Sequence, residues 1–243
     1  MEAFVNIARG TKVVVLTGAG ISAESGIPTF RDKGGLWEKY DLMSVATPEA
    51  FERDPKLVWR FYIERIKQGG AIQPNPAHYA LARLERLLPT GDFSLITQNV
   101  DDLHRKAGSK NLYHMHGELA KTRCTRCHRV EQTPEEIPDL PRCQCGGLLR
   151  PHVVWFGEIP FDTEKLYRMV EECGVFLVVG TSGVVHPAAG FVAHAKRSGA
   201  MTVGVNLEVP DNRFYIDHFY QGKAGDVLPR FVDHWARCLE AES

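Results

Sequence analysis

The sequence predicts an α/β fold in which a parallel sheet carries helices on both faces and a small zinc-binding module is attached. Two observations predict it. Continuous apolar runs such as Val13–Leu16 and Val175–Val179 alternate with segments of helical periodicity, as in parallel sheets whose strands are buried on both faces. Four of the six cysteines lie between residues 121 and 150, where large apolar residues are few. We expect such a stretch to need a metal to fold.

Each element follows from its period, its length and the residues that end it. Short apolar runs predict strands, apolar residues at helical spacing predict helices, and Gly26-Ile27-Pro28 ends the first helical turn. In chain order we expect a strand over 13–17, a helical turn over 22–25, a loop over 30–40, helices over 48–68 and 76–88, a strand over 93–97, the cysteine-rich stretch, a strand over 175–179, a helix over 187–198, a strand over 201–206 and a helix over 227–239. The expected domains are a large one (1–37, 89–119 and 151–243), a helical insertion (38–88) and the zinc-binding module (120–150).

Composition narrows the function classes. The net charge is −1, so the chain lacks the basic footprint of a nucleic-acid binder. No apolar run approaches the ~20 residues that span a membrane, and the first residues do not form a signal-peptide pattern. Clustered cysteines indicate a metal site in a reducing compartment rather than a disulfide framework. We therefore expect a cytoplasmic protein that needs neither membrane nor nucleic acid; a monomer is compatible with the sequence.

The motif Gly18-x-Gly20-x-x-Ala23 follows the first strand directly. Such glycines let the backbone approach a diphosphate at a helix N-terminus. A tight turn that needs small residues explains the motif equally well when it is taken alone. A dehydrogenase would also place an acidic residue at the end of a second strand, but the segment before Asp41 is loop-like. We therefore expect the ribose to be held elsewhere, with Glu208 as the candidate and a solvated carboxylate as its alternative.

Polar residues follow the strand that ends at Thr97. Gln98, Asn99 and Asp101 are expected at the carboxyl edge of the sheet, where ligands of open α/β sheets bind, although a polar turn that caps a helix is the alternative. His114 and His116 share one face of an extended segment. His116 precedes Gly117, and its ordinary pKa of about 6.5 suits a general base at neutral pH. Local evidence favours His116 over His114 only slightly.

The cysteines have the spacing C-x2-C-x15-C-x-C, formed by Cys124, Cys127, Cys143 and Cys145. Four thiolates suit tetrahedral zinc and leave no open position, so the expected zinc is structural. Four free cysteines are the alternative. Zinc ribbons also bind nucleic acid, but the near-neutral charge argues against that function.

Together these segments resemble the sirtuins, NAD-dependent protein lysine deacylases. The resemblance covers nearly the whole chain in family order. It is carried by Gly18-Ala19-Gly20-Ile21-Ser22, Gly26-Ile27-Pro28-x-Phe30-Arg31, Thr97-Gln98-Asn99-Val100-Asp101, His116-Gly117, the cysteine pairs, Val154-Trp155-Phe156-Gly157-Glu158, Gly180-Thr181-Ser182 and Val205-Asn206-Leu207. The spacing Cys143-x-Cys145 departs from many members, which leaves the loop geometry there open.

The resemblance implies a Rossmann-like domain and a zinc module, with NAD and an acyl-lysine peptide in the cleft between them. It implies that the NAD site comprises Gly18, Ala19, Gly20, Ser22, Ala23, Phe30, Arg31, Trp37, Gln98, Asn99, Val100, Asp101, Gly180, Thr181, Ser182, Asn206, Leu207, Glu208 and Ala224. It implies that the substrate strand pairs with Val153, Val154, Trp155, Phe156 and Gly157, in the strand-addition mode.

The resemblance also implies the reaction. The acyl-lysine carbonyl oxygen attacks C1′ of the nicotinamide ribose, and nicotinamide leaves. Asp101 orients the carboxamide, Asn99 holds a ribose hydroxyl or water, and His116 deprotonates a ribose hydroxyl. The deprotonated hydroxyl then attacks the imidate carbon, and one water enters at the last step to release the amine. The products are lysine, nicotinamide and O-acyl-ADP-ribose.

Tyr62 and Arg65 share a face of the helix expected over 48–68. A surface pair is the default interpretation. The pair also matches the Tyr-x-x-Arg motif of sirtuins that remove succinyl, malonyl and glutaryl groups, and Thr29 resembles that branch. A guanidinium and a phenol bind a distal carboxylate with about 1.5–3 kcal/mol, which is roughly 10- to 100-fold in discrimination. We therefore expect desuccinylation and demalonylation, with weaker deacetylation.

Three other functions remain open from the sequence. A Rossmann dehydrogenase would transfer a hydride to NAD. An NAD-sensing module would bind the dinucleotide and release no nicotinamide. A mono-ADP-ribosyltransferase would release nicotinamide and leave ADP-ribose on a protein.

Overall fold

The computed structural model describes residues 3–29 and 41–241 and contains a six-stranded parallel sheet. The strand order is β3-β2-β1-β7-β8-β9, which is the doubly wound order of Rossmann folds. The strands are β1 (Val13–Thr17), β2 (Phe93–Thr97), β3 (Leu112–His114), β7 (Val175–Val179), β8 (Met201–Asn206) and β9 (His218–Gln221). The predicted strands and the predicted fold class are confirmed.

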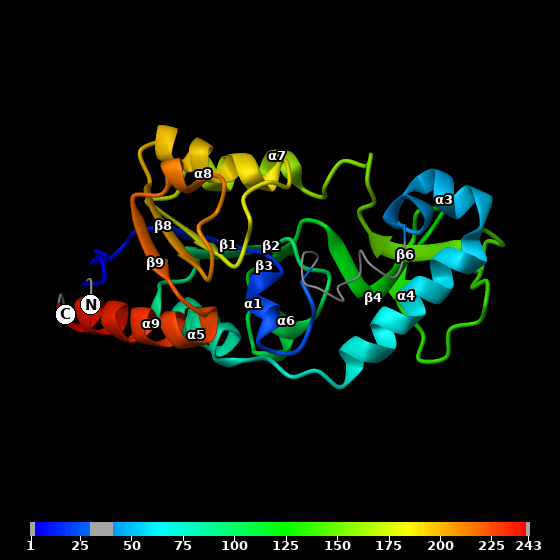
Figure 1. Ribbon diagram of the computed structural model, residues 1–243, viewed down its shortest axis with the longest axis horizontal. Coiled ribbons are helices and arrows are strands. Elements are labelled where there is room, and N and C mark those ends of the chain that lie inside the picture. Colours follow the sequence, from blue (N-terminus) through cyan, green and yellow to red (C-terminus); the bar gives the residue numbers. More distant parts are fainter. Residues whose placement is uncertain (1–2, 30–40, 242–243) are drawn as a thin grey trace.

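The inner strands are buried because helices cover both faces of this sheet (Figure 1). Two apolar cores result, one on each face. The helices of one face are α7 (Thr163–Glu171) and α8 (Ala188–Arg197), and those of the other are α1 (Gly20–Ala23), α5 (Pro76–Leu87), α6 (Leu103–Lys106) and α9 (Ala224–Ala241). A short 3-10 helix, η2 (Arg213–Tyr215), precedes β9. Both termini lie at the far end of this domain from the small sheet (Figure 1).

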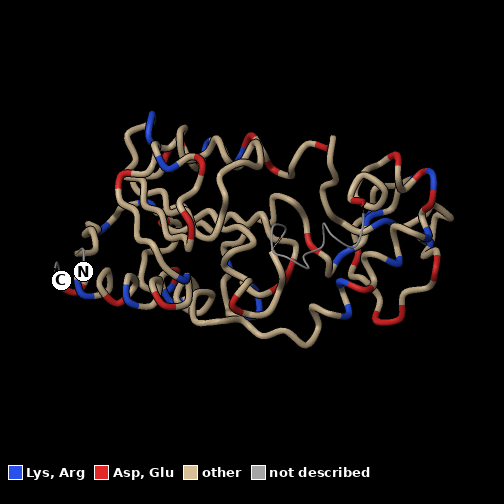
Figure 2. The backbone as a smooth tube through the Cα atoms, viewed as in Figure 1, with Lys and Arg blue, Asp and Glu red and all other residues tan. Residues whose placement is uncertain are grey.

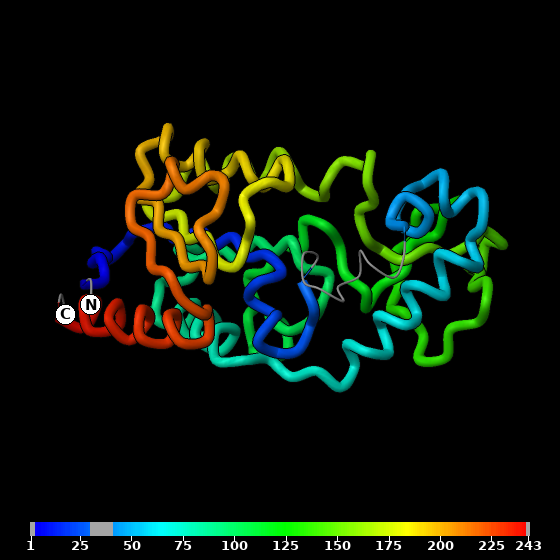
Figure 3. The backbone as a smooth tube through the Cα atoms, in the orientation of Figure 1, coloured from blue at the N-terminus to red at the C-terminus, as the bar shows by residue number. Residues whose placement is uncertain are grey.

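A second, antiparallel sheet of three strands has the order β5-β4-β6. Its strands are β4 (Gly117–Cys124), β5 (Val130–Gln132) and β6 (Leu149–Val153). The small sheet lies beside η1 (Leu42–Ser44), α3 (Pro48–Arg53) and α4 (Pro55–Gly70), at the other end of the molecule (Figure 3). These elements share one core, which contains Trp59, Phe61 and Trp155.

The prediction of a single helix over 48–68 is wrong. The structure has two helices there, α3 and α4, which are separated at Asp54. Pro55 has no amide hydrogen to continue α3, and it is well suited to the first position of a new helix. The Asp54 side chain accepts a hydrogen bond of 3.0 Å from the Leu57 amide and so caps α4.

The helices of the segment 38–88, expected as a helical insertion, pack in two different places. Helices α3 and α4 pack with β4 and β6, whereas α5 packs against α9 on the large sheet. The small sheet also extends past the expected residues 120–150 at both ends, since β4 begins at Gly117 and β6 ends at Val153.

Charges of both signs are distributed over both parts of the molecule, in line with the net charge of −1 (Figure 2). Among the described residues, no helix is long and apolar enough to cross a membrane.

Candidate active site

The carboxyl edge of the large sheet has a switch point between β1 and β7, where the chain leaves toward opposite faces. Gly18 and Gly20 lie against Gly180 there. A Cβ on Gly18 would be 2.8 Å from the Gly180 carbonyl oxygen, and one on Gly180 would be 2.4 Å from the Ile21 amide nitrogen. Gly180 also has a φ of +61°, which disfavours other residues. The three glycines therefore bring the first turn and the end of β7 into direct backbone contact.

A polar network joins this turn to the segment after β2. The Asn99 side-chain amide donates to the Gly18 carbonyl and to the Ser22 hydroxyl, at 3.1 Å each. Ser22 in turn donates to Asp101 at 3.0 Å, and the Leu103 amide donates to the other oxygen of the same carboxylate at 3.1 Å. Burial raises the pKa of Asp101, which these two hydrogen bonds oppose. Asn99 and Asp101 are thus held in fixed orientations at the edge of the sheet.

His116 lies after β3 and is oriented by the backbone. Its Nδ1 is 3.1 Å from the Gln98 carbonyl oxygen. Because a carbonyl oxygen only accepts, Nδ1 carries the hydrogen and Nε2 keeps its lone pair. Burial lowers the pKa of His116, so the imidazole is neutral at neutral pH.

His114 differs from His116 in its surroundings. Its Nδ1 lies 3.4 Å from the Asn99 carbonyl oxygen, and its Nε2 is buried without a partner among the described residues. Of the two rings, only His116 therefore combines a fixed tautomer with a basic nitrogen that is not enclosed.

The remaining nucleotide-side candidates gather at the ends of β2, β7 and β8. Gln98 donates to the Thr181 hydroxyl at 3.2 Å, and Asn206 donates to the Thr181 carbonyl at 3.1 Å. Glu208 is exposed. The other candidates described near this edge, with differing exposure, are Ala19, Ala23, Ser182, Leu207 and Ala224. Val100 instead packs against the core of the small sheet.

The four cysteine sulfurs lie within 4.8 Å of one another. The Sγ atoms of Cys124 and Cys145 are 3.4 Å apart, and those of Cys127 and Cys143 are 3.7 Å apart. Tetrahedral zinc with bonds of about 2.3 Å separates its sulfurs by about 3.8 Å, so the residues fit the ion. The amides of Cys127 and Arg126 donate to the Cys124 sulfur and lower its pKa to about 6, which favours the thiolate. The short Cys143-x-Cys145 spacing does not prevent the cluster.

The pair Tyr62 and Arg65 lies on α4, which packs with β4 and β6 of the small sheet. The Tyr62 hydroxyl accepts a hydrogen bond of 2.9 Å from the indole N–H of Trp155. Burial raises the pKa of Tyr62, so the phenol is neutral. Burial lowers the pKa of Arg65, which the Asp101 carboxylate opposes at longer range. In the part of the chain that the structure describes, Arg65 forms no salt bridge.

The segment expected to receive the substrate strand already uses most of its amides. Val154 donates to the His116 carbonyl at 2.9 Å, and Phe156 donates to the Ala46 carbonyl at 3.0 Å. Trp155 donates to the Glu158 carboxylate at 2.8 Å. Of the amides from Val154 to Gly157, that of Gly157 has no acceptor within the described residues.

With this geometry in place, the comparisons with known proteins decide the family. The sequence profile of the Sir2 family matches residues 18–187. The chain belongs to the Sir2 family. An NAD-dependent protein deacylase of Pasteurella multocida (strain Pm70) is 52% identical over 227 residues, which are 91% of this chain and 96% of that protein. One of Pyrococcus furiosus is 49% identical over 241 residues, 95% of this chain and 96% of that protein.

Solved Sir2 structures share the fold of the whole chain. A Sir2 homologue–NAD complex gives a TM-score of 0.86 at 45% identity and covers 96% of this chain and 92% of that one. A Sir2 complex with a deacetylated p53 peptide and 3′-O-acetyl ADP ribose gives 0.81 at 33% identity and covers 92% of this chain and 93% of that one. The family and the fold predicted from the sequence are thereby confirmed.

Three predicted Sir2 cofactor residues, Phe30, Arg31 and Trp37, lie outside the described residues. Two buried histidines were not predicted at this site. His78 lies 3.5 Å from the Ser22 hydroxyl, and its ring centroid is 4.8 Å from that of His104, which contacts Thr17 at 3.0 Å. The sequence feature that could have revealed His78 is its place at the third position of α5. There its side chain accepts a hydrogen bond from the Asn75 amide and completes a capping box.

Proposed function

We propose that this Sir2 enzyme, an NAD-dependent protein deacylase, removes succinyl, malonyl and glutaryl groups from protein lysines in preference to acetyl groups. The observation that carries the proposal is the half-buried Arg65, which has no ion-pair partner in the described chain and whose guanidinium carbon lies 5.9 Å from the centre of the Tyr62 ring. A buried cation without a carboxylate is unfavourable unless a ligand supplies one.

The chemistry of the pair fits a distal carboxylate. The guanidinium offers parallel N–H donors, and the neutral Tyr62 phenol still has its hydrogen to donate because its oxygen accepts from Trp155. Charge-assisted hydrogen bonds of this kind contribute about 1.5–3 kcal/mol. An acetyl group would leave Arg65 with water alone, so we expect roughly 10- to 100-fold discrimination.

The reaction then follows from the residues at the edge of the large sheet. NAD supplies an electrophilic ribose carbon with nicotinamide as its leaving group. Asn99 and Asp101, fixed by Ser22 and Leu103, would orient polar groups of the dinucleotide. His116 would take a ribose hydroxyl proton at Nε2, since Nδ1 is committed to the Gln98 carbonyl.

We propose that the acyl-lysine peptide lies along residues 153–157. The Gly157 amide would supply the pairing donor, since the three preceding amides already donate within the protein. The four cysteines would fill all the positions of a tetrahedral zinc ion, so the role of the zinc would be structural.

The test uses one peptide sequence that carries acetyl-, succinyl-, malonyl- or glutaryl-lysine, with NAD and mass spectrometry of all products. Wild type is compared with Arg65→Met and with the matched control Arg60→Met, an exposed arginine on the same helix. We expect NAD-dependent loss of acidic acyl groups to dominate and to fall selectively in Arg65→Met. Dominant acetyl loss that Arg65→Met leaves unchanged would contradict the acidic-acyl pocket, and ADP-ribose on the peptide would indicate the transferase.

A further inference from the structure

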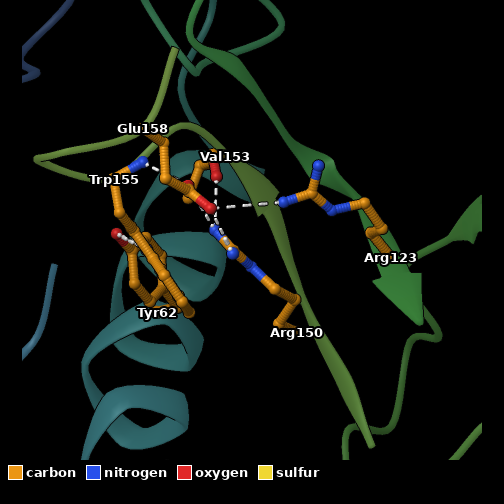
Figure 4. A network of polar contacts seen from close by, with 6 residues as sticks. All are labelled: Tyr62, Arg123, Arg150, Val153, Trp155 and Glu158. Atoms are coloured by element: carbon orange, nitrogen blue, oxygen red, sulfur yellow. Dashed lines mark hydrogen bonds and ion pairs between the residues drawn. The ribbon is translucent and has the colours of Figure 1, made fainter. Parts of the chain in front are cut away.

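An ion pair between the buried Arg150 and the half-buried Glu158 lies next to Trp155, and no step of the proposed reaction uses it. Arg150 on β6 is 7% exposed, and its guanidinium donates to both oxygens of Glu158 at 2.7 and 2.8 Å (Figure 4). It also donates to the Val153 carbonyl at 2.9 Å. Arg123 approaches the same carboxylate at 3.5 Å. The Arg150 charge is therefore committed to Glu158, and Arg150 is not a ligand for an incoming carboxylate.

The ion pair holds Trp155 in place, and Trp155 lies between the ion pair and Tyr62. Glu158 accepts the Trp155 backbone amide at 2.8 Å, and the Arg150 guanidinium carbon lies 3.4 Å from the centre of the Trp155 ring. Phe51 packs against the same ring, with centroids 5.3 Å apart. Trp155 is 3% exposed, so its ring is fixed by a hydrogen bond at its backbone, by a stacked cation and by an aromatic neighbour.

The fixed ring makes one hydrogen bond to the pocket. The indole N–H of Trp155 donates to the Tyr62 hydroxyl at 2.9 Å (Figure 4). An indole nitrogen is a donor only, so this contact makes the phenol oxygen an acceptor and directs the phenol hydrogen elsewhere. Without the donor, the hydroxyl could rotate freely and could itself donate in a different direction.

We propose that Arg150 and Glu158 are positioning residues for acyl selectivity, because they hold Trp155 so that its indole N–H aims the Tyr62 hydroxyl hydrogen at the distal carboxylate of the acyl group. This proposal rests on the proposed function. A largely desolvated ion pair contributes little net stability over apolar residues of equal size, whereas it fixes orientation, and orientation is what the Trp155–Tyr62 contact needs.

The test measures kcat/KM for succinyl- and acetyl-peptides in Trp155→Phe and Glu158→Gln. Trp155→Phe keeps an aromatic ring and removes the indole donor, and Glu158→Gln keeps the size of the side chain and removes its charge. We expect the succinyl-to-acetyl ratio to fall about three- to tenfold in each variant, the range of one hydrogen bond. In a Tyr62→Phe background, Trp155→Phe should leave the ratio unchanged.

A matched control separates positioning from general damage. Trp59 donates its indole N–H to the Leu149 carbonyl at 2.9 Å in the same core and does not bond to Tyr62. Trp59→Phe therefore removes an equivalent hydrogen bond, and we expect the ratio to stay at the wild-type value. General damage would lower both activities together and leave the ratio unmoved in every variant.

The outcomes are distinguishable. If Arg65→Met lowers the ratio while Trp155→Phe and Glu158→Gln keep it, the positioning role is wrong and the acidic-acyl pocket stands. A wild-type enzyme with no succinyl preference would overturn both. Should Glu158→Gln not fold in a thermal melt, Trp155→Phe decides the question alone.

Discussion

The nucleotide edge of the large sheet and the zinc-bearing small sheet are built by different means. The edge depends on backbone contact between glycines and on a network of side-chain hydrogen bonds, above two apolar cores of its own. The small sheet has one core, in which two of the thiol ligands, Cys124 and Cys143, are themselves buried members. From this difference we expect that the small sheet depends on zinc and that the proposed acyl selectivity, which involves residues packed with that sheet, can change without altering the NAD site.

Loss of a zinc ligand should have the largest effect. Cys124→Ser should abolish zinc binding and activity, because a structural zinc site contributes folding free energy outright. Zinc content, turnover and circular dichroism would measure it. Cys238→Ser, at a cysteine on α9 far from the cluster in sequence, is the control and should keep zinc and activity. Full activity of zinc-free Cys124→Ser would show that the small sheet folds without the ion.

Replacement of the proposed base, His116, should have the second-largest effect. His116→Gln should lower kcat about 10²- to 10⁴-fold, the usual contribution of a general base, while NAD still binds. Turnover and NAD titration would check both. Because burial lowers the pKa of His116, the wild-type rate should fall only below about pH 6.5, as the neutral imidazole is lost. If His116→Gln kept turnover near the wild-type value, another group would have to be the general base.

The buried His78 should make stability depend on pH. Burial lowers its pKa to about 4, below the ordinary value of about 6.5, so the unfolded chain binds the proton more tightly between these values. Its contribution is therefore present above pH 6.5 and is lost as the pH falls toward 4, by about 3 kcal/mol.

Denaturant unfolding at pH 7 and pH 4 would measure this effect in wild type and in His78→Gln. Glutamine can still accept the Asn75 amide in the capping box but does not titrate. Wild type should lose about 3 kcal/mol more than the variant. Equal losses would show that His78 is protonated in the folded state.

Disruption of the contact that Gly180 makes with Gly18 and Gly20 should have the smallest effect. Gly180→Ala should destabilise the fold by about 1–3 kcal/mol beyond Gly199→Ala, because both have positive φ but only Gly180 would place its Cβ against backbone. Thermal unfolding and the KM for NAD would measure both variants. Equal stability of the two would mean that the turn relaxes at no cost.

The parts that depend on short-range pattern could be predicted from the sequence. Strands such as Val175–Val179 follow from a continuous apolar run, and the cysteine cluster follows from spacing. The end of α3 could not be predicted from the sequence, because Pro55 is compatible with either a kink or a new helix.

Contacts between segments that are distant along the chain could not be predicted from the sequence either. His78 lies beneath Ser22 only because α5 packs on the large sheet, and Trp155 meets Tyr62 only because α4 crosses the small one. No local pattern encodes either contact, since each depends on how separate elements pack.

The most direct test of the central claim is a competition in one tube. Wild-type enzyme and NAD receive equal concentrations of the succinyl- and acetyl-lysine forms of one peptide, and mass spectrometry follows the early loss of each, which gives the ratio of kcat/KM. We expect the succinyl peptide to disappear at least about tenfold faster than the acetyl peptide. Faster loss of the acetyl peptide would contradict it.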